Sequence, residues 1–353
     1  MRSSENISWF ADITLQDRSA VGGKGGSLGE LTRAGIAVPP GFVVRTGGFE
    51  SFLANLEMEE PIRPRVESLS DDDLDQITAL SKRVRARFEN APLPQDLQSE
   101  IIEAHAELCG ERPDSPLAVR SSATTEDAED ASFAGLQDTF LWVLGARATL
   151  KNVRSCWASL YSVSSIAYRR KHRIWEDRVA MAVVVQQMVD ARTAGVMFTR
   201  SPLTGDRSVI TIEATWGLGS AVVSGEVTPD RFVIAKITGE ISRRDISDKH
   251  IRHLPAADGG NGIDEVETPE EIRRMPSVSD EELAALRDIG RKIERHYGRP
   301  QDIEWAIDRN GKILLLQSRP ETVWSAKDAM PVARPAQNPL THVMNIFGFG
   351  GRR

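Results

Sequence analysis

The chain has 353 residues, of which 40% are hydrophobic and 27% charged, and its formal net charge is −7. These values fit a globular protein of two domains or one large two-lobed unit. They exclude a basic surface for binding nucleic acid, because the basic residues are scattered along the sequence and outnumbered by acidic residues. No apolar run approaches the roughly 18 residues of a membrane span, and the two isolated cysteines form no metal motif or disulfide framework. The start of the chain has no signal-peptide pattern, so we expect a cytoplasmic protein without membrane or nucleic-acid partners.

The first distinctive segment, residues 22–29, surrounds Lys24 with glycines and leads into a short helix that Gly35 can end. Glycines let backbone N–H groups approach an anion, and the start of the following helix adds positive potential. The spacing fits neither a Walker A motif nor a dinucleotide fingerprint. We interpret the segment as a phosphate loop, and a flexible surface turn is the alternative.

Two amphipathic helices are expected next. Ser70 should cap the first, with the aspartates at 71–73 in its first turn, where they favour the helix dipole. These acids are assigned to helix-end charge and not to a metal. The second helix runs from about residue 96 to 108, and His105 on it should be half-exposed, as should His296 on a later helix.

A short strand over residues 117–120 ends at Arg120. An arginine at this strand end can bridge phosphates across a cleft, or it can pair with Glu126 or Asp127. A polar loop follows at 132–139. The function of Arg120 stays open on these residues alone.

A helix is expected over 153–168, followed by a buried β-branched strand over 179–189. Backbone groups at the end of this strand could contact an adenine edge, although an ordinary core strand is the plain alternative. Glu213, ahead of a glycine-broken loop, could add a metal or ribose contact. Further strands are expected at 195–199, 209–213 and 231–237. Capping boxes at Thr268 and Ser279 should start two late helices.

The end of the chain predicts a hairpin whose geometry can be worked out. If Asn310 and Gly311 are the central residues of a tight turn, Arg309 faces Lys312. Counting back pairs Glu304 with Gln317 and Asp302 with Arg319. Side chains alternate along strands, so these four lie on one face. Carboxylates suit Mg²⁺, and arginine suits a phosphate; the alternative is an Asp302–Arg319 ion pair on a solvated face.

Several motifs now occur in one order: 23–28, 119–122, 132–139, 195–199, 302–305 and 316–320. Together, over about residues 8–324, they resemble the N-terminal nucleotide-binding domain of phosphoenolpyruvate synthase, pyruvate phosphate dikinase and rifampin phosphotransferase. The resemblance implies an α+β fold of the ATP-grasp type. It further implies an N-terminal lobe over 1–189 and a C-terminal lobe over 190–324. The composition of residues 325–353, with three prolines, an excess of basic residues and an apolar end, predicts a tail that is disordered or docks on a partner.

By the same resemblance, Lys24, Arg120 and Arg319 are catalytic and contact the phosphates of ATP, while Glu304 and Gln317 hold Mg²⁺ with the support of Asp302. The loop containing Gly135 and Thr139 closes over the phosphates; Leu136 departs from the polar residue common in relatives. The segment expected to contact adenine is Gln186, Gln187, Met188 and Val189.

The family passes the β-phosphate of ATP to a histidine on a swivelling domain, with release of AMP and phosphate. The histidines of this chain include none in a small-residue loop suited to that role. We therefore expect the ATP-binding subunit of a split enzyme resembling phenylphosphate synthase, inactive without a histidine-carrying partner subunit, whose final acceptor is a phenolic or benzylic alcohol. The alternatives are a separately encoded part of a phosphoenolpyruvate synthase or rifampin-type enzyme, a self-contained small-molecule kinase, and a non-catalytic nucleotide-binding module.

Overall fold

The computed structural model describes residues 3–71, 73–124, 138–322 and 324, with the backbone of 127–128 and 131–132. The expected contact of Gly135 and the docking role of the tail at 325–353 fall outside the described residues. The fold belongs to the first of two compact units, Met1–Pro320 and Glu321–Arg353. Among the described residues, no helix combines the length and the apolarity needed to cross a membrane.

The first sheet is antiparallel and has five strands in the order β1-β2-β7-β3-β6. Its strands are β1 (Ile7–Trp9), β2 (Gly41–Val44), β3 (Leu117–Ala123), β6 (Thr139–Val143) and β7 (Met181–Gln187). Every residue of β2 and β3 is buried, as suits central strands covered on both faces. A two-stranded piece, β4 (Asp127–Ala128) with β5 (Ala131–Ser132), follows β3 in the chain.

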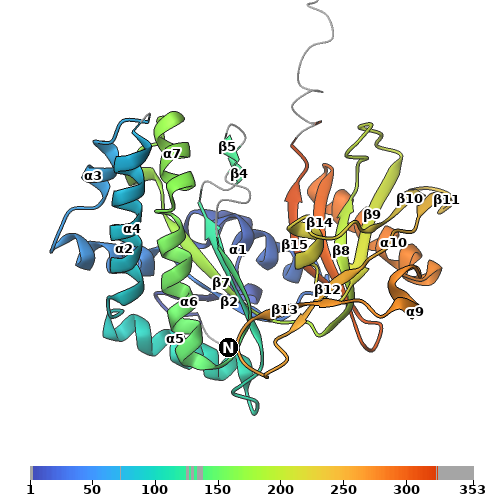
Figure 1. The fold of residues 1–353 in the computed structure, drawn as a ribbon, viewed down its shortest axis with the longest axis horizontal. Coiled ribbons are helices and arrows are strands. Elements are labelled where there is room, and N and C mark those ends of the chain that lie inside the picture. Colours follow the sequence, from blue (N-terminus) through green and yellow to red (C-terminus); the bar gives the residue numbers. More distant parts are fainter. Residues whose placement is uncertain are drawn as a thin grey trace, which may run out of the picture. The chain divides into compact units, whose positions relative to one another are not determined.

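Helices cover one face of this sheet, to the left in Figure 1. They are α2 (Thr46–Glu57), α3 (Arg63–Glu67), α4 (Leu74–Asn90), α5 (Gln95–Cys109), α6 (Gly145–Ser159) and α7 (Val163–Lys171). Short 3₁₀ turns occur at Phe10–Asp12, Leu15–Asp17 and Glu176–Arg178. The aromatic rings of Phe49, Phe52, Phe88 and Trp157 pack together at the centre of this core, with centroids 5.4–6.2 Å apart. The strands and helices up to residue 187 therefore form one lobe with a continuous core.

The second sheet is also antiparallel, with six strands in the order β11-β10-β9-β8-β14-β15. Its strands are β8 (Ala191–Phe198), β9 (Val209–Trp216), β10 (Asp230–Ala235), β11 (Ile241–Asp245), β14 (Gln301–Asp308) and β15 (Ile313–Pro320). Helix α10 (Asp280–Tyr297) packs on it through Leu283, Leu286 and Ile293, with Gly290 against Met197. Also in this part are α8 (Ser220–Val223), α9 (Glu270–Arg273) and a two-stranded ribbon of β12 (Ile251–Pro255) and β13 (Ile263–Glu267).

Helix α1 (Arg18–Arg33) contributes to both lobes. Val21 and Leu28 pack with residues of β2 and β7, whereas Leu31 belongs to the core of the second sheet. The glycine segment was expected to be a loop ahead of a helix. α1 consists of two helical pieces that meet at Gly22, whose φ of 71° is not helical. Residues 23–29 are therefore helical and not a loop, although a break in the helix does precede Lys24.

Three local expectations are wrong for identifiable reasons. The cap of α4 is Asp73 and not Ser70, because the Asp73 carboxylate accepts the backbone N–H of Gln76 at 3.0 Å. Asp71 and Asp73 therefore precede the first turn, which was expected to contain them, and Asp75 is the acidic residue within it. The helix expected over 153–168 is divided, since Ser162 caps a new helix, α7. Thr268 forms no capping box, because Pro269 occupies the N-cap of α9. The capping box at Ser279 is confirmed.

His105 was expected to be half-exposed, and this is also wrong. It lies on the inner face of α5 and is 4% exposed. Burial lowers the pKa of its imidazole below the usual value, because the charged form is poorly solvated there. His296 is partly exposed, as expected, and its Nε2 lies 2.7 Å from Glu30.

Candidate active site

The hairpin of β14 and β15 pairs the residues that the sequence analysis brought together. Asp302 lies opposite Arg319, and Glu304 lies opposite Gln317. The alternative to a metal site was an ion pair between Asp302 and Arg319. This pair is present but long, with Arg319 Nε 3.5 Å from Asp302 Oδ2. All four residues line one cavity.

The turn of this hairpin differs from the prediction. Asp308, and not Arg309, pairs with Lys312, so three residues form the loop. The Asp308 carboxylate accepts the backbone N–H groups of Asn310 and Lys312, at 2.8 and 2.9 Å. A bulge that adds Leu316 to β15 restores the pairing at Glu304. The site register is therefore as predicted, although the expected pairing of Arg309 with Lys312 is wrong.

Arg120 was expected at the end of a strand, but β3 continues to Ala123, so Arg120 lies at the middle of the strand. From there it reaches from the first lobe to this hairpin. Its Nη2 lies 2.7 Å from Glu304 Oε2 and 2.8 Å from Gln317 Oε1, and its Nη1 donates to the carbonyl oxygen of Leu316 at 2.9 Å. The described partners of Arg120 thus lie on the second lobe. The alternative partner Glu126 and the side chain of Asp127 lie outside the described residues.

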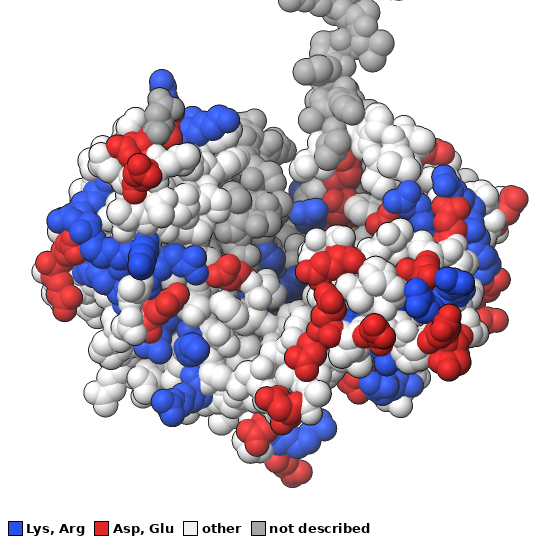
Figure 2. All heavy atoms as spheres, in the orientation of Figure 1, with Lys and Arg blue, Asp and Glu red and all other residues white. Residues whose placement is uncertain are grey.

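A cavity of about 970 Å³ lies between the lobes, and nearly all of the predicted site residues line it. They are Lys24, Arg120, Thr139, Gln186, Gln187, Met188, Val189, Asp302, Glu304, Gln317 and Arg319. Figure 2 shows the surface hollowed between the two lobes, with basic side chains inside the hollow. Segments far apart in the sequence therefore converge on one space.

The lining offers two kinds of chemistry. Three cations, two carboxylates and the Gln317 amide suit a phosphate chain with a divalent cation. The segment 186–189 adds the end of a strand, with Met188 and Val189 as apolar side chains. Gln186 donates its side-chain N–H to Pro39 and Gln187 donates to Leu108, both to carbonyl oxygens. Gln186 is buried, whereas Met188 is partly exposed and can meet a ring.

Helix α1 is held against β3 by contacts that the sequence analysis missed. The Ser122 hydroxyl donates to the carbonyl oxygen of Val21 at 2.8 Å and accepts the N–H of Gly25 at 3.1 Å. A Cβ on Gly22 would lie 2.0 Å from the carbonyl oxygen of Ser122, and one on Gly29 would lie 2.5 Å from Ile13. Close packing therefore accounts for glycines that the sequence analysis assigned to anion binding. Lys24 still lines the cavity.

Glu213 does not line this cavity. Its carboxylate accepts two hydrogen bonds from Arg231 on the neighbouring strand, at 2.9 and 2.6 Å. The metal or ribose contact considered for it has no support in the geometry.

The sequence analysis also missed residues 261–263, which line the cavity at the end of the β12–β13 ribbon. The side chain of Asn261 accepts the N–H of Leu144 at 2.7 Å, and the N–H of Gly262 donates to the carbonyl oxygen of Trp142 at 3.0 Å. The ribbon of the second lobe therefore touches the first lobe beside the cavity. The glycines around Asn261 were the available signal, because they mark a tight loop.

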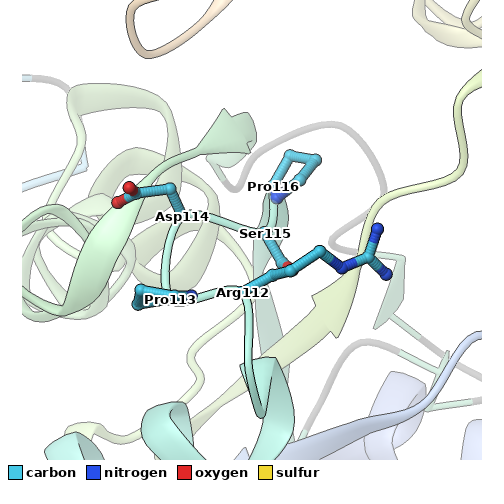
Figure 3. A pocket seen from close by; sticks show the side chains of 5 residues that line it. All are labelled: Arg112, Pro113, Asp114, Ser115 and Pro116. Atoms are coloured by element: carbon cyan, nitrogen blue, oxygen red, sulfur yellow. The ribbon is translucent and has the colours of Figure 1, made fainter.

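A smaller hollow of about 440 Å³ lies in the connection between α5 and β3, lined by residues 112–116 (Figure 3). The side chains of Arg112 and Asp114 point away from each other. Five consecutive residues of one loop bring no distant groups together. We place the functional site in the larger cavity.

Known proteins resemble this chain along most of its length. Residues 18–338 match the family model described as the pyruvate phosphate dikinase AMP/ATP-binding domain. The chain is 43% identical over 318 residues to a probable phosphoenolpyruvate synthase of Methanothermobacter thermautotrophicus, covering 90% of this chain and 46% of that protein. It is 37% identical over 356 residues to the phosphoenolpyruvate synthase of Pyrococcus furiosus, covering 90% and 44%.

Among solved structures, D-alanyl-alanine synthetase A from Vibrio cholerae overlaps 69% of this chain and 54% of its own, with 14% identity and a TM-score of 0.26. This TM-score is too low for the overlap to support a fold assignment. The two α+β lobes around one cavity agree with the expected ATP-grasp type of fold. The chain spans less than half the length of the two synthases. By the family model, which matches most of its length, the chain belongs to the pyruvate phosphate dikinase AMP/ATP-binding domain family.

Proposed function

We propose that this chain binds Mg-ATP in the cavity between its lobes and carries out the first step of a dikinase-type phosphoryl transfer. The observation that carries the proposal is the joining of Arg120 on β3 to Glu304 and Gln317 on the hairpin. This contact places a cation, a carboxylate and an amide from the two lobes at one point of the cavity. Phosphoryl transfer depends mainly on positioning and on charge neutralisation, and these groups supply both.

The roles of the basic residues follow from the charge of the triphosphate. Lys24, Arg120 and Arg319 would neutralise the phosphate oxygens from α1, β3 and β15. The three hydrogen bonds of Arg120 use three of the five N–H donors of a guanidinium, so two can face a phosphate. Arg120 can therefore bind an anion without leaving Glu304.

The donor set at the hairpin fits a magnesium ion. Glu304, Gln317 and Asp302 offer only oxygen ligands, and Mg²⁺ favours one or two carboxylates together with substrate phosphates. A magnesium ion held by these residues would offset part of the negative charge of the phosphates. The residues of this chain would hold it on the face of the hairpin that lines the cavity.

The phosphoryl acceptor in this proposal is a histidine beyond the described residues, on a partner subunit or on another domain. Within the part of the chain that the structure describes, the cavity lining includes no histidine. Because the chain covers less than half of the synthases it matches, such a domain has room in an assembly of their kind. The chain would then bind ATP by itself and turn over only with that histidine.

Two kinds of final acceptor are considered for the phosphoryl group. Phosphoenolpyruvate synthases are the relatives compared above, and they favour the alternative in which the chain is the ATP-binding part of such an enzyme. The phenolic or benzylic acceptor of a phenylphosphate-type synthase stays a prediction, because nothing in the cavity selects between the two acceptors.

Phosphorus NMR of the chain with Mg-ATP, together with a calorimetric binding titration, tests the proposal. We expect binding with one ATP per chain and no turnover, and formation of AMP and phosphate once a histidine-bearing domain of a phosphoenolpyruvate synthase is added. Absence of Mg-ATP binding would overturn the site. Sustained release of AMP or ADP by the chain alone would overturn the requirement for a separate histidine.

A further inference from the structure

A second cluster of potential ligands lies outside the hairpin, at the middle of the β12–β13 ribbon. It consists of Glu226, in the turn after α8, His253 on β12 and Glu265 on β13. One ligand atom from each residue lies within 4.8 Å of the other two. His253 and Glu265 are direct cross-strand partners, and Glu226 comes from a separate segment. None of the three lines the ATP cavity.

The imidazole of His253 is held from several sides. Its Nδ1 lies 2.8 Å from the hydroxyl of Ser220, and its Nε2 lies 2.9 Å from Glu226 Oε2. The residue is 8% exposed, and its backbone carbonyl accepts the N–H of Leu218. Histidines that bind metals usually engage one ring nitrogen in a hydrogen bond to a neighbouring group, which fixes the ring and directs the other nitrogen at the ion. Ser220 is placed to do this.

The two carboxylates give the cluster its charge. Carboxylate oxygens of Glu226 and Glu265 lie within 4.8 Å of each other beside one imidazole, so the two carboxylates bring two negative charges to the cluster. Like charges at such a separation repel unless a cation lies between them. A divalent cation would compensate both carboxylates and use the ring nitrogen as its third ligand.

We propose that Glu226, His253 and Glu265 form a binding site for a divalent transition metal of the zinc type. One nitrogen and two carboxylate oxygens, completed by water, match the donor preference of zinc, cobalt or manganese. Mg²⁺ prefers oxygen ligands alone, so this site and the hairpin differ in the ion that they favour. The proposal does not depend on ATP binding.

The place of the cluster indicates a structural role for the ion. The three ligands come from three segments, and their joint coordination would fix the middle of the ribbon to the turn after α8. The far end of the same ribbon touches the first lobe through Asn261 and Gly262. Metal binding would therefore raise the thermal stability of this part of the chain, since an ion that binds only the folded state stabilises it.

The test is a titration of the metal-free chain with Co²⁺, followed by its visible absorption, in the presence of excess Mg²⁺ to occupy oxygen-only sites. We expect one Co²⁺ per chain, displacement by Zn²⁺, and a higher melting temperature with the metal. His253→Ala should abolish the Co²⁺ spectrum, and Glu265→Gln should weaken binding by at least about tenfold. His250→Ala is the matched control, because His250 is an exposed histidine next to the same ribbon and outside the cluster.

A further variant separates the two sites. Glu304→Gln changes the hairpin and should leave Co²⁺ binding unchanged. Removal of the buried His253 ring can affect folding. Glu265 is exposed, so Glu265→Gln is the second variant, and its weaker Co²⁺ binding must be measured in a folded protein. Absence of Co²⁺ binding to the wild-type chain, or binding that Glu265→Gln and His253→Ala leave intact, would overturn the proposal.

Discussion

Arg120 is the residue through which the first lobe meets the proposed metal ligands of the second. Its side chain is 10% exposed and shares a hydrogen-bonded ion pair with Glu304. Ion pairs with little solvent around them hold their geometry well, and they cost several kcal/mol when one partner is removed alone. At the residue scale, Glu304 therefore has two tasks, because it orients Arg120 and offers oxygens to a cation.

Glu304→Gln separates these tasks, since the amide oxygen can still accept from Arg120 while the negative charge is gone. We expect Mg-ATP to bind about ten- to hundredfold more weakly, because contacts with charged groups contribute about 1.5–3 kcal/mol. Calorimetric titration with and without Mg²⁺ measures this change. Asp190→Asn is the control, because Asp190 makes an exposed ion pair with Arg309. An unchanged dependence on Mg²⁺ in Glu304→Gln would contradict the metal assignment.

Gly22 combines a positive φ of 71° with a carbonyl oxygen 2.0 Å from the place of a Cβ. Gly35, just after the same helix, has a φ of 65° with nothing within 4 Å of that place. Gly35→Ala should lower the free energy of unfolding by about 1 kcal/mol, the cost of the backbone conformation alone. Gly22→Ala should cost clearly more, because α1 must also move away from Ser122. Urea unfolding of both variants measures the difference, and equal losses would show that close packing at Gly22 is unimportant.

At the scale of elements, the β12–β13 ribbon connects to the first lobe mainly through its loop. Asn261→Ala removes the acceptor for the N–H of Leu144. We expect faster hydrogen exchange at Leu144 and faster release of bound ATP, because residues 261–263 line the cavity. Asp258→Ala is the control, since its carboxylate accepts a hydrogen bond from Gly260 within the same loop. Equal hydrogen exchange at Leu144 in the two variants would contradict the proposed contribution of the ribbon to the retention of ATP.

The hairpin also shows how much of the site could be predicted from the sequence. Alternation along two strands was enough to pair Glu304 with Gln317, because the side-chain period of a strand is two. The turn was predicted one residue too short, and the bulge at Leu316 offset this error. Neither feature has a strong sequence signal, since the loop depends on Asp308 accepting two backbone N–H groups.

Other parts of the site could not be predicted because they depend on packing between distant segments. The bond from Arg120 to Glu304 joins residues 184 positions apart. Local patterns report propensity and capping, and they correctly gave the capping box at Ser279. They could not show that the glycines of α1 face Ser122 and Ile13, because contacts of that kind are settled by the tertiary fold.

At the scale of the whole molecule, stability should depend on alkaline pH. Burial raises the pKa of the Cys156 thiol to about 12, from an ordinary value of 9.0. Burial also raises the pKa of the Tyr161 hydroxyl above its ordinary value of 10.0. Both groups keep their protons in the folded chain at pH values where the unfolded chain loses them. The folded state thus binds more protons, and its stability falls as the pH rises from about 9.

The expected slope is about 1.4 kcal/mol per pH unit for each group between its unfolded and folded pKa values. Urea unfolding at a series of pH values between 8 and about 11 measures it. Cys156→Ala removes one of the two groups and should make the slope between pH 9 and 10 markedly smaller, while native Cys156 should resist alkylation at pH 8. A free energy of unfolding that stays constant over this range would contradict the burial argument.

Helix α1 also bears on the order in which the protein acquires its structure during synthesis. Leu31 is completed by the ribosome long before β8 to β15, yet its side chain belongs to the core of that sheet. Ile36 and Val38 pack against the same core. Until about residue 320 has emerged, a nascent chain must therefore keep an apolar docking face on α1 uncovered. That interval is when a chaperone or a second nascent chain would find this face.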